Sequence, residues 1–181
     1  SVLKTGDKRK ELEHGVAVLA TGAKSSVPTE YGFGEDDRII TTLDLDKMLK
    51  EKDSKLADAN TAVFIQCVGS REPERPYCSR VCCTHSVKSA LDFKQKNPDV
   101  NVSILFRDMR TYGKREDLYR EARAAGVLFF TYSPDQKPEV RPDGDRVIVE
   151  FTDRILNHKL AVRADILCLA SSIISHWDHS L

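Results

Sequence analysis

The sequence predicts an α/β fold with a parallel central sheet. Short, continuous apolar runs recur after residue 60, as expected for strands buried on both faces. Segments with helical spacing of apolar residues separate these runs. A late pair of extended segments then leads to a final apolar run. This strand–helix alternation is typical of a parallel sheet, with the late pair as a β-hairpin excursion.

The first part of the chain predicts little regular structure. Residues 8–12 and the apolar run at 16–20 are expected to be two extended stretches, the second buried on both faces. Thr42 is a plausible N-cap for a short helix that continues to about Lys50. Residues 53–60 are polar and indicate a linker.

The middle of the chain carries the first two βα units. Residues 62–67 predict a buried strand, which a loop rich in Arg, Glu and Pro follows. Ser79 is a candidate cap for the next helix, which continues to Lys96. The second strand is expected at 102–106, and a loop at 107–113 follows it.

The remaining elements complete the sheet and its excursion. A helix is expected at 114–125, ended by Gly126, and a third strand at 127–132. Residues 146–151 and 159–162 have the pattern of a hairpin, and 165–170 form a last buried strand.

Composition excludes several functional classes. The 181 residues include 28 Lys plus Arg and 28 Asp plus Glu, so the formal charge is zero. A neutral balance without polybasic runs argues against nucleic acid and membrane surfaces. No apolar stretch approaches the length of a membrane span. The chain begins with Ser1 and is interpreted as a fragment of a longer protein.

The most informative pattern is a cluster of cysteines. Four of the five cysteines, Cys67, Cys78, Cys82 and Cys83, have the spacing C-x10-C-x3-C-C. A secreted disulfide framework would disperse its cysteines, so a reducing cytoplasm is the expected location. Cys168 stands alone in an apolar strand and is expected to be a small buried hydrophobe.

The fold predicts that these four side chains converge. Cys67 ends a strand, and the other three lie in the following loop and at the start of its helix. In open α/β sheets, ligands bind at the carboxyl ends of the strands. On one regular helix Cys78 and Cys82 would be about 40° apart and Cys83 about 140° from Cys78. The helix must therefore begin near Cys82 if both adjacent cysteines are ligands.

Four clustered thiols allow several chemistries. An iron–sulfur cluster suits four thiolates, and the helix start with Arg71, Arg75 and Arg80 would favour its negative charge. Zinc also takes four thiolates, but its usual C-x2-C knuckles are absent. A redox dithiol usually has the C-x-x-C spacing, which is absent as well. Structural cysteines are the remaining alternative.

Several longer motifs resemble a known family. They are residues 63–71 (VFIQCVGSR), 77–83 (YCSRVCC), 105–113 (LFRDMRTYG) and 118–123 (LYREAR). These stretches closely resemble the A subunit of heterodisulfide reductase and the related flavin subunits of methanogens and sulfate reducers. The resemblance covers nearly the whole chain.

This resemblance implies a fold and two cofactors. The family is an iron–sulfur flavoprotein with a thioredoxin-reductase-like region that carries FAD. It implies a Rossmann-like three-layer nucleotide-binding domain of the FAD/NAD(P)-binding type. It also implies that Cys67, Cys78, Cys82 and Cys83 hold a [4Fe-4S] cluster. The function implied is electron transfer between FAD and this cluster in anaerobic metabolism.

The resemblance also suggests two domains and a place for the flavin. Residues 1–58 would be the C-terminal remnant of the FAD-binding domain with a linker, and 59–181 an NAD(P)-binding-like domain. Ala20, Thr21 and Gly22 resemble the segment that lies close to the flavin in this class. The matching second segment departs from the pattern at Ser171, where glycine is usual. No G-x-G-x-x-G motif is present to bind the FAD pyrophosphate, so FAD is expected in the full-length protein.

Other candidate residues carry weaker signals. Only Gly69 remains where an NAD(P)H-binding glycine fingerprint would follow the strand. Arg107, Arg110 and Lys114 flank the end of the second strand, where residues that bind the 2′-phosphate of NADPH often lie, but they are interpreted as solvated loop charges. His85 is interpreted as an ordinary helix-surface histidine. No catalytic triad or carboxylate pair is evident, so no catalytic residue is predicted.

The expected role is therefore that of an oxidoreductase within a full-length complex, and the isolated chain is expected to be inactive. The resemblance implies other reductase subunits as partners and donors such as hydrogenase or ferredoxin. The alternatives are a thioredoxin-reductase-like dithiol oxidoreductase and a zinc-stabilised interaction module.

Overall fold

The computed structural model describes residues 1–18 and 20–176. The chain forms two compact units. Of the described residues, one unit contains those up to Lys24 together with residues 175 and 176, and the other contains Ser25–Ile174. Among the described residues, no helix is both long enough and apolar enough to cross a membrane.

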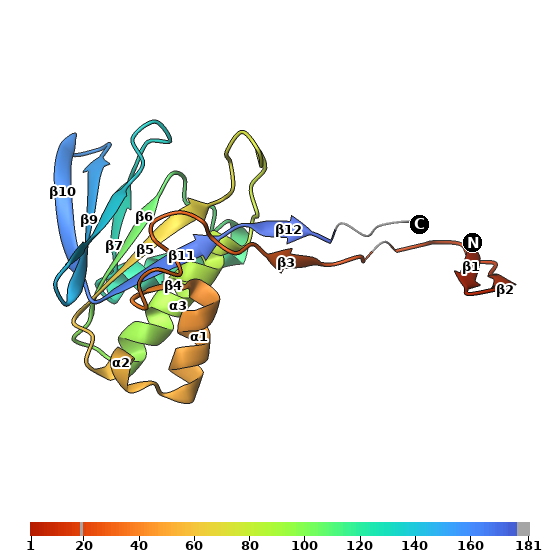
Figure 1. Ribbon diagram of the computed structural model, residues 1–181, viewed down its shortest axis with the longest axis horizontal. Helices are drawn as coiled ribbons and strands as arrows, with labels where there is room; N and C mark the ends of the chain where they lie inside the picture. The colour runs from red at the N-terminus through yellow and green to blue at the C-terminus, as the bar shows by residue number, and fades with distance from the viewer. Residues whose placement is uncertain (19, 177–181) are drawn as a thin grey trace. The chain divides into compact units, whose positions relative to one another are not determined.

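A five-stranded parallel sheet forms the centre of the larger unit (Figure 1). Its strands are, in spatial order, β4 (Ile39–Thr41), β11 (Ile166–Ser171), β5 (Thr61–Val68), β6 (Asn101–Phe106) and β7 (Leu128–Thr131). Every residue from Ala62 to Val68 is buried, because layers cover both faces of the central strand. The predicted strands at 62–67, 102–106, 127–132 and 165–170 are all present.

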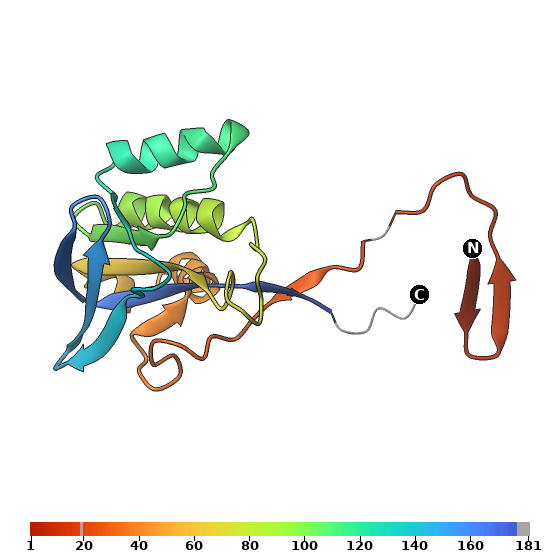
Figure 2. The same cartoon turned by 90° about the horizontal axis from the view of Figure 1, so that it is seen from above.

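Helices cover one face of this sheet. They are α1 (Thr42–Glu51), α2 (Ser54–Ala57), α3 (Cys82–Lys96), the 3₁₀ turn η1 (Gly113–Arg115) and α4 (Glu116–Ala124). Phe64 and Ile104 of the sheet pack with Leu45, Val87 and Ala122 of the helices. Figure 2 shows α3 and α4 on the same side of the strands.

A small antiparallel sheet covers the other face. It consists of β8 (Glu139–Asp143), β9 (Arg146–Asp153) and β10 (His158–Ala164), with β9 in the middle. Alternate residues of β9 are buried and pack against Val63 and Ile65 of β5. The predicted three-layer, Rossmann-like α/β fold with a parallel central sheet is thus confirmed. The sequence indicated β9 and β10, but β8 was missed because its segment contains Pro142.

Two local predictions require correction near α1. The N-cap is Thr41 rather than Thr42. The Thr41 hydroxyl accepts a hydrogen bond from the backbone N–H of Asp44, and the Asp44 carboxylate accepts one from the backbone N–H of Thr41. This reciprocal pair is a capping box. The polar stretch predicted as a linker contains α2, whose side chain Leu56 is buried in the helix layer.

The smaller unit does not contain the predicted buried strand at residues 16–20. The described residues of that run lie outside any strand, and Val16 and Val18 are 80% and 84% exposed. Leu19 lies outside the described residues. An apolar run becomes a buried strand only where neighbouring strands pair with its backbone. The pairing in this part of the chain instead joins β1 (Val2–Thr5) to β2 (Lys8–Glu11).

A further two-stranded sheet joins β3 (Ala23–Ser25) to β12 (Ile173–Ser175). The predicted domain division, 1–58 and 59–181, concerns a longer protein and stays a prediction. Within this chain, β4 and α1 belong to the same compact unit as β5.

Candidate functional site

The backbone at the end of β5 departs from a regular strand at Cys67. The register between β5 and β11 shifts between Leu169 and Ser171, which produces an irregular, bulge-like pairing. Cys67 has a φ of 62°, in the left-handed region that few non-glycine residues occupy. Gly69 and Arg71 follow with φ values of 66° and 59°. Bulges next to functional sites re-aim side chains, and strained residues gather at such sites.

Helix α3 begins at the adjacent cysteines. Cys82 and Cys83 are its first two residues, and both are buried. The helix start required by the ligand geometry is therefore confirmed. Ser79 does not cap α3, because its hydroxyl accepts from the backbone N–H of Ile173 at 2.9 Å. Within the described part of the chain, no side chain caps the N-terminal N–H groups of α3, which remain available to an anionic group.

The other three clustered cysteines all influence the pKa of Cys82. A hydrogen bond with Cys83 and burial raise the pKa of Cys82, and the charges of Cys83, Cys67 and Cys78 raise it further. The Cys83 thiol donates to the carbonyl of Asp108 at 3.7 Å. The Cys78 thiol is half-buried and accepts from the backbone N–H of Arg80 at 3.3 Å.

All five cysteines are free thiols. Among the described residues, no group of three or more His, Cys, Asp or Glu side chains is already arranged to hold a metal ion. Cys168 lies apart from the cluster. It is paired with Phe64 in the sheet, packs in the helix-side core, and burial raises its pKa.

Positive charge surrounds the cysteines. Burial and the nearby Cys83 raise the pKa of Cys67, while Arg107 and Arg71 oppose this shift. A hydrogen bond from Cys82 lowers the pKa of the Cys83 thiol. A hydrogen bond with the backbone of Arg110 and the positive charges of Arg110 and Arg71 also lower it. The structure therefore confirms that Arg71 adds positive charge at the cluster. Arg80 is exposed, and Arg75 binds the Gly69 carbonyl at 3.0 Å.

Arg107 was wrongly interpreted as a solvated loop charge. It is only 5% exposed and pairs with the Glu72 carboxylate. It also donates to the Arg71 carbonyl at 3.1 Å and to the Tyr132 hydroxyl at 3.3 Å. Tyr132 in turn donates to the carbonyl of Gln66 at 2.7 Å. This network ties the ends of β6 and β7 to the cysteine loop.

The network was missed because its members are far apart in sequence. One signal could have indicated a role for Arg107: it directly follows a buried strand, and the carboxyl ends of parallel strands meet at one edge of the sheet. No sequence signal identified Glu72 or Tyr132. Arg110 and Lys114, the other residues interpreted as solvated, are exposed, and Arg110 pairs with Asp108 at 3.5 Å.

The remaining candidates lie outside the cluster. Ala20, Thr21 and Gly22 are exposed and belong to the smaller unit. His85 lies on α3, but its ring pairs with Asp46 of α1 at 2.5 Å, so it bridges two helices.

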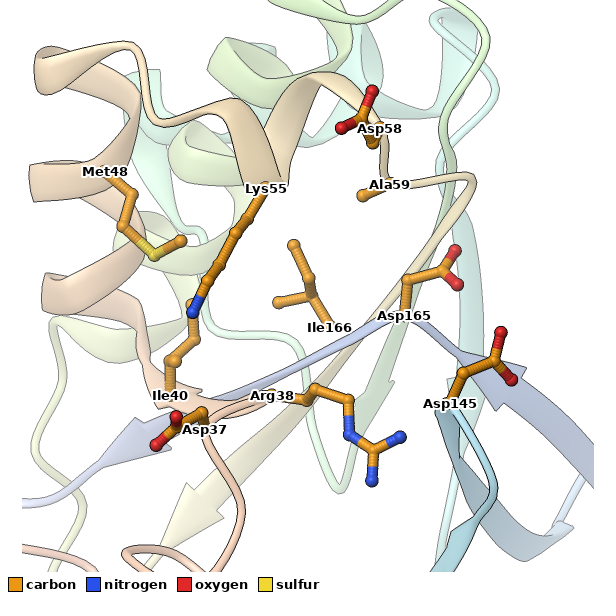
Figure 3. A pocket seen from close by; sticks show the side chains of 10 residues that line it. All are labelled: Asp37, Arg38, Ile40, Met48, Lys55, Asp58, Ala59, Asp145, Asp165 and Ile166. Carbon is orange, nitrogen blue, oxygen red and sulfur yellow. The ribbon is translucent and has the colours of Figure 1, made fainter.

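A cavity of about 340 Å³ lies at the opposite, amino edge of the sheet (Figure 3). Ile166 lies in the middle of it, with charged side chains around it, Lys55 and Asp58 among them. None of the predicted site residues lines this cavity.

The donor set at the carboxyl edge fits an iron–sulfur cluster. Four thiols, uncapped helical N–H groups and the guanidinium groups of Arg71 and Arg110 combine soft ligands with a positive environment. Such surroundings stabilise the thiolates and anionic sulfides of a cluster.

Comparison with solved structures identifies the class of fold. The chain is similar to an FAD-dependent pyridine nucleotide-disulphide oxidoreductase from Desulfovibrio vulgaris, with a TM-score of 0.52 and 14% identity over 93% of this chain and 38% of that one. It is also similar to thioredoxin reductase from Lactococcus lactis, with a TM-score of 0.51 and 14% identity over 95% of this chain and 51% of that one. The fold is that of FAD- and NAD(P)-dependent oxidoreductases. No family model matches the chain.

Sequence relatives are more specific. The chain is 33% identical, over 93% of its length, to the iron-sulfur A subunit of CoB–CoM heterodisulfide reductase from Methanocaldococcus jannaschii. It is 36% identical, over 74% of its length, to the A subunit of H(2):CoB-CoM heterodisulfide,ferredoxin reductase from Methanothermobacter marburgensis. The chain spans 28% and 22% of these relatives. It is thus homologous to one region of the A subunit of heterodisulfide reductase, as the motifs indicated.

Proposed function

We propose that this chain is the part of a flavoprotein, of the type of the heterodisulfide reductase A subunit, that holds a [4Fe-4S] cluster at Cys67, Cys78, Cys82 and Cys83. Through this cluster it relays electrons to and from FAD. The full-length protein would act as an oxidoreductase within a complex, and the isolated chain would be inactive.

The observation that carries this proposal is the position of the four thiols. Cys67 ends β5 at the carboxyl edge of the sheet, where open α/β sheets bind their ligands, and Cys82 and Cys83 begin the uncapped helix α3, with Cys78 in the loop between them. The curated relatives include one named an iron-sulfur subunit. Together these findings support a cluster rather than a set of structural thiols.

The residues of this chain have distinct roles in the proposal. The N–H groups at the start of α3 and the guanidinium of Arg71 favour the thiolate form of the ligands. The bulged backbone at Cys67 aims its side chain away from a regular strand register. Burial of Cys67, Cys82 and Cys83 limits contact with water. A [4Fe-4S] cluster, when bound, supplies one-electron transfer.

FAD would be held mainly by other parts of the longer protein. Residues 1–58 would be the remnant of its FAD-binding domain, with Ala20, Thr21 and Gly22 close to the flavin, and residues 59–181 the domain that carries the cluster. The exposed backbone of this tripeptide is compatible with close approach of a ligand. A strand-end loop with only one glycine gives no support to NAD(P)H binding.

Other reductase subunits would be the partners, and redox proteins such as hydrogenase or ferredoxin the electron donors. The relatives are named as subunits, which supports an assembly. A cytoplasmic location is proposed because the cysteines are unpaired thiols.

A cysteine panel tests the proposal. Each of Cys67, Cys78, Cys82 and Cys83 is replaced by Ser, and iron is measured after anaerobic reconstitution with iron and sulfide. We expect about four irons per parent chain and loss of most of this iron in every variant. Cys168→Ser is the matched control, since this cysteine is buried outside the cluster, and it should keep its iron.

Other metal contents would support the alternatives. Stoichiometric zinc with unfolding on chelation would indicate the zinc-stabilised module. An easily oxidised thiol pair in a chain that takes up no iron would indicate the dithiol oxidoreductase. Equal iron loss from Cys168→Ser and the four cluster variants would contradict the proposed ligand set.

A further inference from the structure

The unpaired buried polar atoms of this chain gather around the cysteines. Among the described residues, the buried side-chain atoms without a hydrogen-bond partner belong to Gln66, Arg71, Thr84 and Ser86. Each of these residues lies within four positions of a clustered cysteine. Unpaired buried polar groups are costly and uncommon, so their restriction to one site calls for a physical reason.

Gln66 is the most pronounced case. It precedes Cys67, is fully buried, and neither the oxygen nor the nitrogen of its amide has a partner. Side chains alternate along a strand, so Gln66 shares the face of Ala62 and Phe64, which pack in the helix-side core. Gln66 is the last of these three along β5. Because α3 follows β5 by a crossover, the carboxyl end of the strand lies level with the first turns of the helix.

Ser86 occupies the corresponding place on the helix. It is fully buried, and its hydroxyl has no partner. It lies three and four residues after Cys83 and Cys82, so the three side chains share one helix face. Side chains of a helix tilt toward its N-terminus, which directs the Ser86 hydroxyl toward the turn that carries both cysteines.

We propose that Gln66 and Ser86 are positioning residues of the cysteine site, whose amide N–H and hydroxyl groups donate hydrogen bonds to the sulfur atoms held there. This inference rests on the proposed cluster. Hydrogen bonds to cluster sulfurs stabilise the more negative, reduced form and raise the reduction potential. The two residues therefore set the potential of the relay without being ligands.

Without the cluster, these two buried polar groups should not stabilise the chain. An unpaired buried polar group destabilises the cluster-free chain, so replacing it with an apolar group of similar size should not reduce stability. Ser89 provides a matched comparison on the same helix. It is also buried, but its hydroxyl donates to the Asp46 carboxylate at 2.6 Å.

The test compares Gln66→Leu, Ser86→Ala and the control Ser89→Ala in two measurements. The first is a redox titration of the anaerobically reconstituted chain, followed by electron paramagnetic resonance. We expect Gln66→Leu and Ser86→Ala each to weaken one-electron reduction about tenfold, equivalent to a shift of about 59 mV to lower potential. Ser89→Ala should leave the potential unchanged, and Ser86→Thr, which keeps the hydroxyl, should restore it.

The second measurement is urea denaturation of the cluster-free chains. Gln66→Leu and Ser86→Ala should keep or raise the denaturation midpoint, whereas Ser89→Ala should lower it. A lower midpoint for Gln66→Leu and Ser86→Ala with an unchanged potential would overturn the inference, because the groups would then have structural partners. If the parent chain takes up no cluster, the proposed function fails and this inference fails with it. If the parent binds a cluster and the potentials do not differ, only this inference fails.

Discussion

The two edges of the parallel sheet differ in whether their polar groups have hydrogen-bond partners. At the amino edge, the Asp165 carboxylate accepts from the backbone N–H groups of Asn60 and Thr61, both at 2.8 Å, and pairs with Arg146 at 2.9 Å. Arg38 pairs in the same region with Asp36. At the carboxyl edge, by contrast, Cys67 follows Gln66, whose buried amide has no hydrogen-bond partner.

The cavity and the proposed cysteine site lie at opposite edges of the sheet. The cavity of about 340 Å³ lies at the amino edge, where charged side chains already join the starts of the strands. The unpaired groups and the left-handed backbone of Cys67 lie at the other edge. In this chain, the unsatisfied polar atoms and the left-handed backbone coincide with the proposed site, whereas the cavity does not. The predictions below test this division.

The largest expected effect concerns the buried Arg107. Arg107→Ala removes the buried guanidinium that pairs with Glu72 and donates to the Arg71 carbonyl and the Tyr132 hydroxyl, so it should lower the free energy of unfolding by about 3 kcal/mol. Glu72 keeps its pair with Lys137 at 2.7 Å. Urea denaturation measures this loss. Arg146→Ala at the amino edge is the comparison, and it should cost about 1 kcal/mol because Arg146 is partly exposed. Equal losses would contradict the different burial of the two networks.

At the amino edge, Asp165 should be structural. Asp165→Ala removes the acceptor for the N–H groups of Asn60 and Thr61 and should lower the free energy of unfolding by about 2–3 kcal/mol. The same cavity offers the exposed Asp145 as a control, and Asp145→Ala should change stability by less than about 0.5 kcal/mol. Both variants should retain the iron of the parent. Loss of iron from Asp165→Ala would show that the two edges are not independent.

In the cysteine loop, Gly69 should tolerate a side chain poorly. Its φ is +66°, and an added Cβ would lie 3.0 Å from the Arg75 guanidinium and 3.4 Å from the Ser172 hydroxyl. Gly69→Ala should therefore cost about 2 kcal/mol. Gly113 has a φ of +65° with nothing within 4 Å, so Gly113→Ala should cost about 1 kcal/mol. Thermal denaturation compares them, and an equal cost would mean that crowding in the loop is negligible.

The smallest expected effect is pH-dependent. A hydrogen bond from Arg38 lowers the pKa of Asp36, outweighing the opposing effect of burial. A lowered pKa favours the folded state fully above the unfolded pKa of about 3.9, and this contribution disappears as pH falls through the folded value. It should amount to less than about 1 kcal/mol. Between about pH 2 and 6, the free energy of unfolding obtained from denaturation curves should change more with pH in the parent than in Asp36→Asn. An identical pH dependence in the two chains would contradict this assignment.

Much of the fold could be predicted from the sequence, because burial on both faces leaves continuous apolar runs. The run at 62–67 became β5, and the helical spacing after Cys83 became α3. The equally apolar run at 16–20 was misleading, since pairing partners, rather than hydrophobicity, decide whether a run is a strand.

The site was predictable only in part. The spacing of the cysteines and the position of Cys67 at a strand end indicated where the thiols would meet. Local sequence patterns did not predict the left-handed backbone of Cys67 or the burial of Arg107, because both depend on tertiary contacts with β11 and with the end of β7. Gln66 lay within the recognised motif, but only the structure shows that its amide is both buried and unpaired.

The most direct test of the central claim is the composition and spectrum of the parent chain after anaerobic reconstitution. The account predicts about four irons and four acid-labile sulfides per chain. It also predicts a paramagnetic signal, on reduction by one electron, that is absent from the Cys67→Ser chain. A chain that binds only zinc, or that binds no metal while remaining folded, would contradict the claim that the carboxyl edge of the sheet is an iron–sulfur site.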